Sequence, residues 1–232
     1  GFQEVEQMKL FEDMVCYQEE VRDPSRVAEV LTRVIAQAKR QSAPAQLNIP
    51  RDMWTKVVDI DIPEPIEFEH SSGGGKSVSD AASLLSEAKA PVILNGAGVV
   101  LSKGGISASM KLAERLDAPV CVGYQHNDAF PGNHPLFAGP LGYNGSKAAM
   151  QLIKEADVVL CLGTRLNPFS TLPGYGLDYW PSEAEIIQVD INPDRIGLTK
   201  KVSIGIVGDA GKVAMDIFSQ LSETAGDSNR DA

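Results

Sequence analysis

The chain has 232 residues, 43% of them hydrophobic, with a formal net charge of −10 and a pI near 4.8. Its length allows one large domain, or one domain and part of another, and its apolar content is enough for a packed core. The acidic balance argues against binding to nucleic acid or to an anionic membrane surface, since both require clustered lysine and arginine. No apolar run approaches the roughly 18 residues of a membrane span, and the first residues do not form a signal peptide.

The cysteines indicate the redox environment of the protein, and the first residues indicate whether the chain is a fragment. Cys16, Cys121 and Cys161 are widely spaced and form no CxxC motif, so the sequence predicts neither a disulfide framework nor a metal site. Cys121 and Cys161 lie in apolar runs and are expected to be buried thiols in a reducing, cytoplasmic protein. The chain lacks an initiator methionine and starts in the middle of a pattern, which suggests a fragment.

The first third of the sequence is typical of the end of an α/β domain. Residues 23–40 are predicted to be a helix, with Asp23 as its N-cap and Pro24 in its first turn. A short strand, Ala45–Ile49, follows and stops at Pro50.

Residues 60–76 contain prolines, acidic residues and the run SSGGG, so they cannot bury a face and are predicted to be a linker. The predicted organisation is a partial α/β domain at 1–59, this linker at 60–76, a second α/β domain at 77–222 and a polar tail at 223–232.

Short apolar strands alternate with amphipathic helices in the second domain, which predicts a parallel sheet with helices on both faces. In such a sheet Gly96, Gly163, Asp190 and Gly208 lie at one edge. The predicted helices are 78–88, 106–116, 146–156 and 209–221, and the predicted strands are 91–95, 119–122, 157–162, 185–189 and 202–207.

Residues at that edge suggest a nucleotide crevice. Glycines at 96–98 allow close approach of a phosphate, Arg165 is suited to grip it, and Asp190 is suited to bind ribose hydroxyls. Each also has a structural interpretation: a tight turn for the glycines, a surface ion pair for Arg165, a braced turn for Asp190 and a helix cap for Asp209.

The segment from Tyr124 to Pro135 combines two histidines with amides and an aromatic residue just beyond a strand. His134 precedes proline and is predicted to be structural. His126 is a candidate for an active-site lining, because histidine side chains in general have a pKa near neutrality. No Walker loop, GxSxG or HExxH motif occurs, so the residues alone indicate a nucleotide-binding-like domain.

Several phrases resemble thiamine-diphosphate enzymes of the acetolactate synthase and pyruvate oxidase group. They occur in the family's order: PVILNGAG, DAFPGNHPLFAGPLGYNGSKAA, ADVVLCLGTR, IIQVDINPDRIG and GDA. The opening Phe2-Gln3-Glu4 and AQLNIPRD resemble parts of the pyrimidine-binding domain. The resemblance implies the central domain of these enzymes, a parallel-sheet NAD/FAD-binding-type fold, preceded by the C-terminal part of an α/β pyrimidine-binding domain.

The resemblance also implies thiamine diphosphate, Mg²⁺ and a homo-oligomer, a dimer or tetramer, with active sites between subunits. The family's catalytic glutamate would precede Gly1 and its GDG…N metal motif would follow Ala232, so the chain alone is expected to be inactive. The candidates for the cleft are Phe2, Gln3, His126 and Asn127.

Within the family, three phrases resemble the acetyltransferases that convert sulfoacetaldehyde and phosphate to acetyl phosphate and sulfite in taurine and sulfonate degradation. They are GFQEVEQMKLFEDMVCYQEEVRDPSR, VGYQHNDAFPGNHPLFAGPLGYNGSK and RLNPFSTLPGYGLDYWP. The alternatives are an acetolactate synthase-like carboligase or decarboxylase with FAD, and a stand-alone nucleotide-binding module.

The question of flavin turns on two departures from the family. Glu12 and Phe169 stand where flavin-binding relatives carry arginines, so FAD is expected not to bind, while an ADP-like nucleotide remains an open alternative. The positions that match the family's cofactor contacts are Gly96, Ala97, Gly98, Gly163, Arg165, Asp190, Ile191, Asp209 and Ala210.

Overall fold

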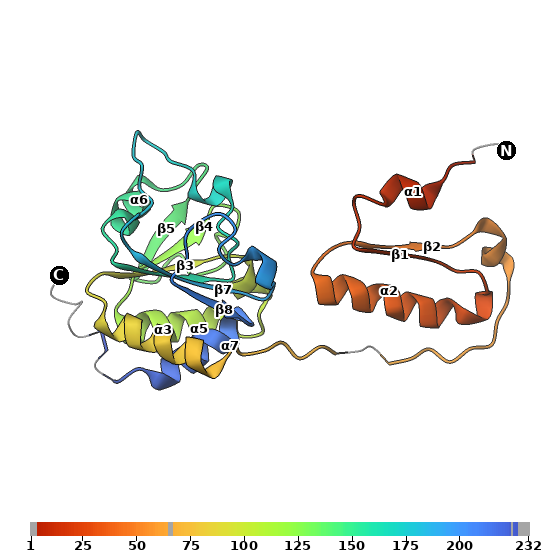
Figure 1. The fold of residues 1–232 in the computed structure, drawn as a ribbon, viewed down its shortest axis with the longest axis horizontal. Coiled ribbons are helices and arrows are strands. Elements are labelled where there is room, and N and C mark those ends of the chain that lie inside the picture. Colours follow the sequence, from red (N-terminus) through yellow and green to blue (C-terminus); the bar gives the residue numbers. More distant parts are fainter. Residues whose placement is uncertain (1–3, 65–66, 224, 227–232) are drawn as a thin grey trace. The chain divides into compact units, whose positions relative to one another are not determined.

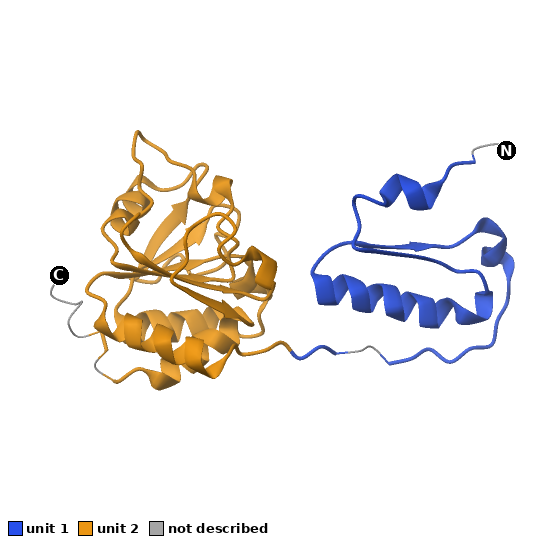
Figure 2. Ribbon diagram, in the orientation of Figure 1, with its two compact units in different colours: residues 1–69 blue, residues 70–232 orange. Residues whose placement is uncertain are grey.

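The computed structural model describes residues 4–64, 67–223 and 225–226. Its contacts divide the chain into two compact units, residues 1–69 and 70–232, which are described separately (Figure 2). None of the helices among the described residues is long and apolar enough to cross a membrane.

Unit 1 is a β-α-β arrangement (Figure 1). Two strands pair in parallel, and the amphipathic helix between them buries Val30 and Val34 against them, together with Val21. The elements are α1 (Gln7–Phe11), β1 (Tyr17–Glu20), the 3₁₀ turn η1 (Pro24–Arg26), α2 (Val27–Gln41), β2 (Ala45–Asn48) and η2 (Arg51–Thr55).

The ends of α2 follow from local chemistry. The Asp23 carboxylate accepts the Ser25 amide at 2.9 Å, which confirms the predicted cap, although the first turn is η1 rather than α-helix. At the other end Ser42 adopts a left-handed φ of 47° and donates its amide to the last turn.

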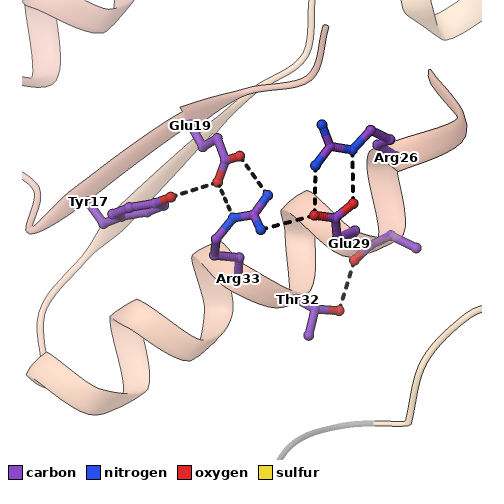
Figure 3. Close-up of polar contacts among 7 residues, drawn as sticks. Tyr17, Glu19, Arg26, Glu29, Thr32 and Arg33 are labelled. Atoms are coloured by element: carbon purple, nitrogen blue, oxygen red, sulfur yellow. Dashed lines mark hydrogen bonds and ion pairs between the residues drawn. The ribbon is translucent and has the colours of Figure 1, made fainter. Parts of the chain in front are cut away.

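An ion-pair network joins α2 to β1 (Figure 3). Arg33 donates two hydrogen bonds to Glu19, at 2.7 and 2.8 Å, and a third to Glu29 at 3.1 Å. Arg26 donates two hydrogen bonds to the same Glu29, at 2.8 and 2.9 Å, and the Tyr17 hydroxyl donates to Glu19. The helix is therefore held to its strand by charged hydrogen bonds at the rim of a small apolar core.

Unit 2 contains a six-stranded parallel sheet in the order β5-β4-β3-β6-β7-β8. The strands are β3 (Pro91–Asn95), β4 (Val120–Gly123), β5 (Phe137–Leu141), β6 (Val158–Leu162), β7 (Glu185–Asp190) and β8 (Ile204–Val207). The helices are α3 (Gly75–Glu87), α4 (Ala97–Leu101), α5 (Gly105–Leu116), α6 (Lys147–Lys154) and α7 (Ala210–Gln220), with 3₁₀ turns η3 (Pro168–Thr171) and η4 (Pro193–Arg195).

Helices cover both faces of this sheet, as the sequence predicts. Helices α3, α5 and α7 lie side by side on one face, where Leu112 and Ala214 are fully buried (Figure 1). Helix α6 covers part of the other face, where Met150, Ile153 and the loop residue Tyr179 are buried. Buried apolar surface on both sides accounts for the continuous apolar strands.

Three elements differ from the predictions. Strand β5 lies inside the predicted long loop; it contains Gly139 and Pro140, which an edge strand tolerates. Helix α4 replaces the predicted glycine-rich turn. Strand β1 reads YQEE and has no apolar alternation, so its pairing with β2 is not visible in the sequence.

The network predicts an acid-sensitive unit 1. Hydrogen bonds from Arg33, and then from Tyr17, lower the pKa of Glu19, and those from Arg26 and Arg33 lower the pKa of Glu29 from 4.5 to about 2. Since the folded pKa values lie below the unfolded ones, this stabilisation is complete above pH 4.5 and is lost as the pH falls towards 2.

We expect the amides of α2, corrected for intrinsic exchange rates, to lose protection between about pH 5 and pH 2. Glu29→Gln should flatten this dependence, whereas Glu87→Gln, an exposed glutamate outside the network, should not. An identical pH dependence in all three proteins would contradict the network's role.

Candidate functional site

The carboxyl ends of four adjacent strands form one continuous edge. Backbone amides bridge neighbouring strand ends: Gly96 donates to Leu162, Gly163 to Val189 and Gly208 to Asp190, at 2.9 to 3.0 Å. The residues predicted to share this edge therefore follow β3, β6, β7 and β8 in spatial order.

Glycines at this edge permit two backbones to touch. A Cβ on Gly98 would lie 2.5 Å from the Cα of Gly163, and one on Gly96 would lie 2.6 Å from the Gly163 carbonyl oxygen. Gly163 also has a left-handed φ of 59°. Close packing between β3 and β6 thus requires glycine at all three positions, whether or not a ligand binds there.

Most backbone donors here are already used inside the protein. The Gly98 amide donates to the Gly163 carbonyl at 2.9 Å, and the Gly96, Gly163 and Gly208 amides are used as described above. Ala97 is the half-buried first residue of the short helix α4. A phosphate would therefore find few of these amides free to donate.

The two carboxylates of the edge have structural partners. Asp190 is buried, accepts the Asn192 amide at 2.9 Å and lies 4.0 Å from the Arg195 guanidinium. Asp209 accepts the amides of Gly211 and Lys212 as the cap of α7. It also accepts the Ser102 hydroxyl at 2.5 Å.

The chain itself covers the end of β8. The Asp209 amide donates to the Ser71 carbonyl at 2.8 Å, and a Cβ on Gly208 would lie 2.8 Å from the Gly73 nitrogen. The neighbouring Ala210 is buried. Residues 70–73 therefore lie over the part of the edge that the sequence suggested for a ligand.

Arg165 and Ile191 remain accessible at this edge. Arg165 is exposed and forms no ion pair or hydrogen bond with the residues that the structure describes. Ile191, after β7, is 36% exposed. Arg165 is therefore a cation at a strand end that is free to bind an anion.

The loop after β4 presents the other candidates. His126 is partly exposed and its Nδ1 lies 3.8 Å from Asp128, while exposed Asn127 contacts the Tyr124 carbonyl at 3.5 Å. His134 contacts Glu114 at 3.2 Å and accepts the Leu136 amide, which confirms its structural role. Phe2 and Gln3 lie outside the described residues.

Two buried amide side chains were not assigned a role from the sequence. Asn95 ends β3, and Gln188 lies within β7, each almost fully buried. The Gln188 amide donates to the carbonyls of Thr164 and Arg195 and accepts the Gly197 amide. The sequence feature that could have indicated these roles is a polar residue between apolar residues of a strand, such as Gln188 between Ile187 and Val189.

The family is identified by comparison with known domains. Residues 78–217 match the model of the central domain of thiamine pyrophosphate enzymes. The chain belongs to the thiamine pyrophosphate enzymes. The central domain of this family thus accounts for the six-stranded sheet and its edge.

The alignments with similar proteins cover both units. A sulfoacetaldehyde acetyltransferase from Roseovarius nubinhibens is 71% identical over 100% of the chain, and a probable one from Rhizobium meliloti is 69% identical. The chain covers 38% and 39% of their lengths. Probable acetolactate synthase large subunits are more distant relatives.

A solved structure supports the fold alone. Benzoylformate decarboxylase from Polynucleobacter necessarius aligns with a TM-score of 0.74 at 23% identity, over 95% of this chain and 43% of that one.

The described residues offer no cluster of their own for a metal ion. Among them, no three His, Cys, Asp or Glu side chains are placed to hold a metal ion. The buried thiols of Cys121 and Cys161 are not suited to this role, since burial raises the pKa of Cys121 to about 12 and that of Cys161 further.

The backbone contact at Gly163 is testable by substitution. We expect Gly163→Ala to lower the free energy of unfolding of unit 2 by about 2 to 5 kcal/mol, from left-handed strain and overpacking together. Gly197→Ala is a matched control: its φ is 70° with nothing within 4 Å of an added Cβ, so only strain of about 1 to 2 kcal/mol should appear.

Urea unfolding in a Trp54→Phe background, followed by Trp180 fluorescence, reports unit 2 alone. Equal losses in the two variants would show that the close approach of β3 and β6 does not constrain Gly163.

Proposed function

We propose that this chain is part of a thiamine-diphosphate-dependent acetyltransferase that converts sulfoacetaldehyde and phosphate to acetyl phosphate and sulfite. One observation carries the proposal: the 71% identity to the Roseovarius enzyme covers the whole chain, including the loop after β4 and both units. Such a protein would act in the degradation of taurine and other sulfonates.

The domain assignment is part of the same proposal. Residues 1–59 form the C-terminal part of a pyrimidine-binding domain, 60–76 a linker, and 77–222 the central domain, with a tail at 223–232. The β-α-β arrangement of unit 1 and the division of the chain into two compact units between Glu69 and His70, inside the proposed linker, support it. Among the described residues between Thr55 and Gly75 there is no helix or strand.

The remaining machinery would come from outside the chain. Thiamine diphosphate would supply the nucleophile for the cleavage, with Mg²⁺ as its metal, and the residues that bind both would lie mainly in other regions. We propose a cytoplasmic homo-oligomer, and a cleft that receives Phe2, Gln3, His126 and Asn127 from this chain.

The alternative is an acetolactate synthase-like enzyme with FAD. Glu12, an exposed residue at the end of α1, and Phe169, which is 61% exposed, disfavour it, because flavin-binding relatives carry arginines at these positions. Each lost charged hydrogen bond to an anionic dinucleotide would cost roughly 1.5 to 3 kcal/mol. A stand-alone nucleotide-binding module is disfavoured by the identity throughout unit 1.

The first test is activity. With sulfoacetaldehyde, phosphate, thiamine diphosphate and Mg²⁺, the complete protein should form acetyl phosphate, and the 232-residue chain should form none. Omitting phosphate is the control, since it removes the acyl acceptor. Turnover by the chain alone, or none by the complete protein, would contradict the proposal.

The second test concerns nucleotides and uses calorimetric titration of the complete protein. We expect no FAD binding in the micromolar range and weak ADP binding that Arg165→Ala weakens about tenfold or more, the effect of one charged hydrogen bond. Micromolar FAD affinity would restore the acetolactate synthase alternative. If Arg165→Ala left ADP binding unchanged, Arg165 would not be a nucleotide contact.

A further inference from the structure

Asn95 is a polar residue in an apolar place. It is the last residue of β3, near the centre of the sheet, and is fully buried. The other residues of its strand are apolar. A buried amide is destabilising unless its donors and acceptor are all satisfied.

The side chain of Asn95 meets this condition with partners from two elements. Its Nδ2 donates to the Ser109 hydroxyl of α5 at 2.8 Å and to the Ala129 carbonyl at 3.0 Å. Its Oδ1 accepts from the same Ser109 hydroxyl at 3.1 Å. Ser109 satisfies the oxygen and one N–H of the amide, and the other N–H points to the loop after β4.

The cleft loop, residues 124–130, has few other polar ties. His126 donates its amide to Gly123, and the Ala129 amide donates to His126, so these bonds only shape the loop's own turns. Within the described part of the chain, the Asn95 bond is the one hydrogen bond from residues 124–129 to an element other than β4.

Ring contacts hold the two ends of the cleft loop. The Phe130 ring is buried 5.0 Å from that of His134, and the Tyr124 ring meets that of Tyr143 at 6.1 Å. The burial of apolar surface in these contacts is not directional, although the rings meet edge to face. A hydrogen bond to the Ala129 carbonyl fixes the position of the turn between them.

We propose that Asn95 is a positioning residue: its amide holds Ala129 and thereby sets where His126 and Asn127 stand at the carboxyl edge. The catalytic consequence rests on the proposed function, because only there does the cleft loop meet a substrate. The positioning itself does not depend on which reaction the protein catalyses.

Hydrogen exchange of the 232-residue chain tests the positioning. Asn95→Leu keeps the number and branching of the side-chain heavy atoms and removes the donor to Ala129, whereas Ser109→Ala disturbs the same buried network and leaves that donor in place. We expect exchange of the His126 and Ala129 amides to accelerate about tenfold relative to those of β6 and β7 in Asn95→Leu, and less than about twofold in Ser109→Ala.

Equal acceleration in both variants, or none in Asn95→Leu, overturns the proposal. In the complete enzyme, kcat should fall about tenfold in Asn95→Leu and stay within about twofold in Ser109→Ala. An unchanged kcat with a loosened loop overturns the catalytic consequence. If the unmodified enzyme forms no acetyl phosphate, the proposed function fails, and the exchange result still decides the role of Asn95.

Discussion

The close approach of β3 and β6 at their carboxyl ends constrains the rest of unit 2. Gly98 and Gly163 meet backbone to backbone, with a hydrogen bond of 2.9 Å between them. Because no side chain fits between these strand ends, the loops that leave them start from fixed positions. Arg165 lies in the loop that follows Gly163. Asn95, directly before Gly96, donates a hydrogen bond to the loop after β4. The edge is therefore rigid at its centre.

This rigidity has a consequence for ligand binding. Residues that match cofactor contacts in the family are used here mainly in the protein's own structure: Asp190 braces a turn, Asp209 caps α7, and residues 70–73 cover the end of β8. Similarity to the family's cofactor-contact positions is thus expected from the requirements of the fold alone. Arg165 is the exception, since none of the described residues neutralises it. A nucleotide would depend on that cation far more than on a preformed cradle of amides.

The sequence predicted the buried elements well and the polar ones poorly. β3 and β6 are continuous apolar runs, and burial on both faces leaves few other solutions, so their positions were predictable within a residue. β1 depends on pairing with β2, and β5 contains glycine and proline; neither pattern contains a local signal. For Asp190 the sequence left two roles open, a ligand residue or the brace of a turn, because whether a carboxylate meets a ligand or a backbone amide depends on loop geometry, which has no periodicity to read.

The two units also differ in the kind of polar group that holds them. Unit 1 uses charged pairs at its rim, where Arg33 and Glu29 are partly exposed and remain sensitive to pH and salt. Unit 2 uses the neutral amides of Asn95 and Gln188 inside its sheet. An amide donates and accepts in fixed directions without the desolvation penalty of a charge, and it does not titrate. Loops held in this way keep their position as the pH changes, because the groups that hold them do not titrate.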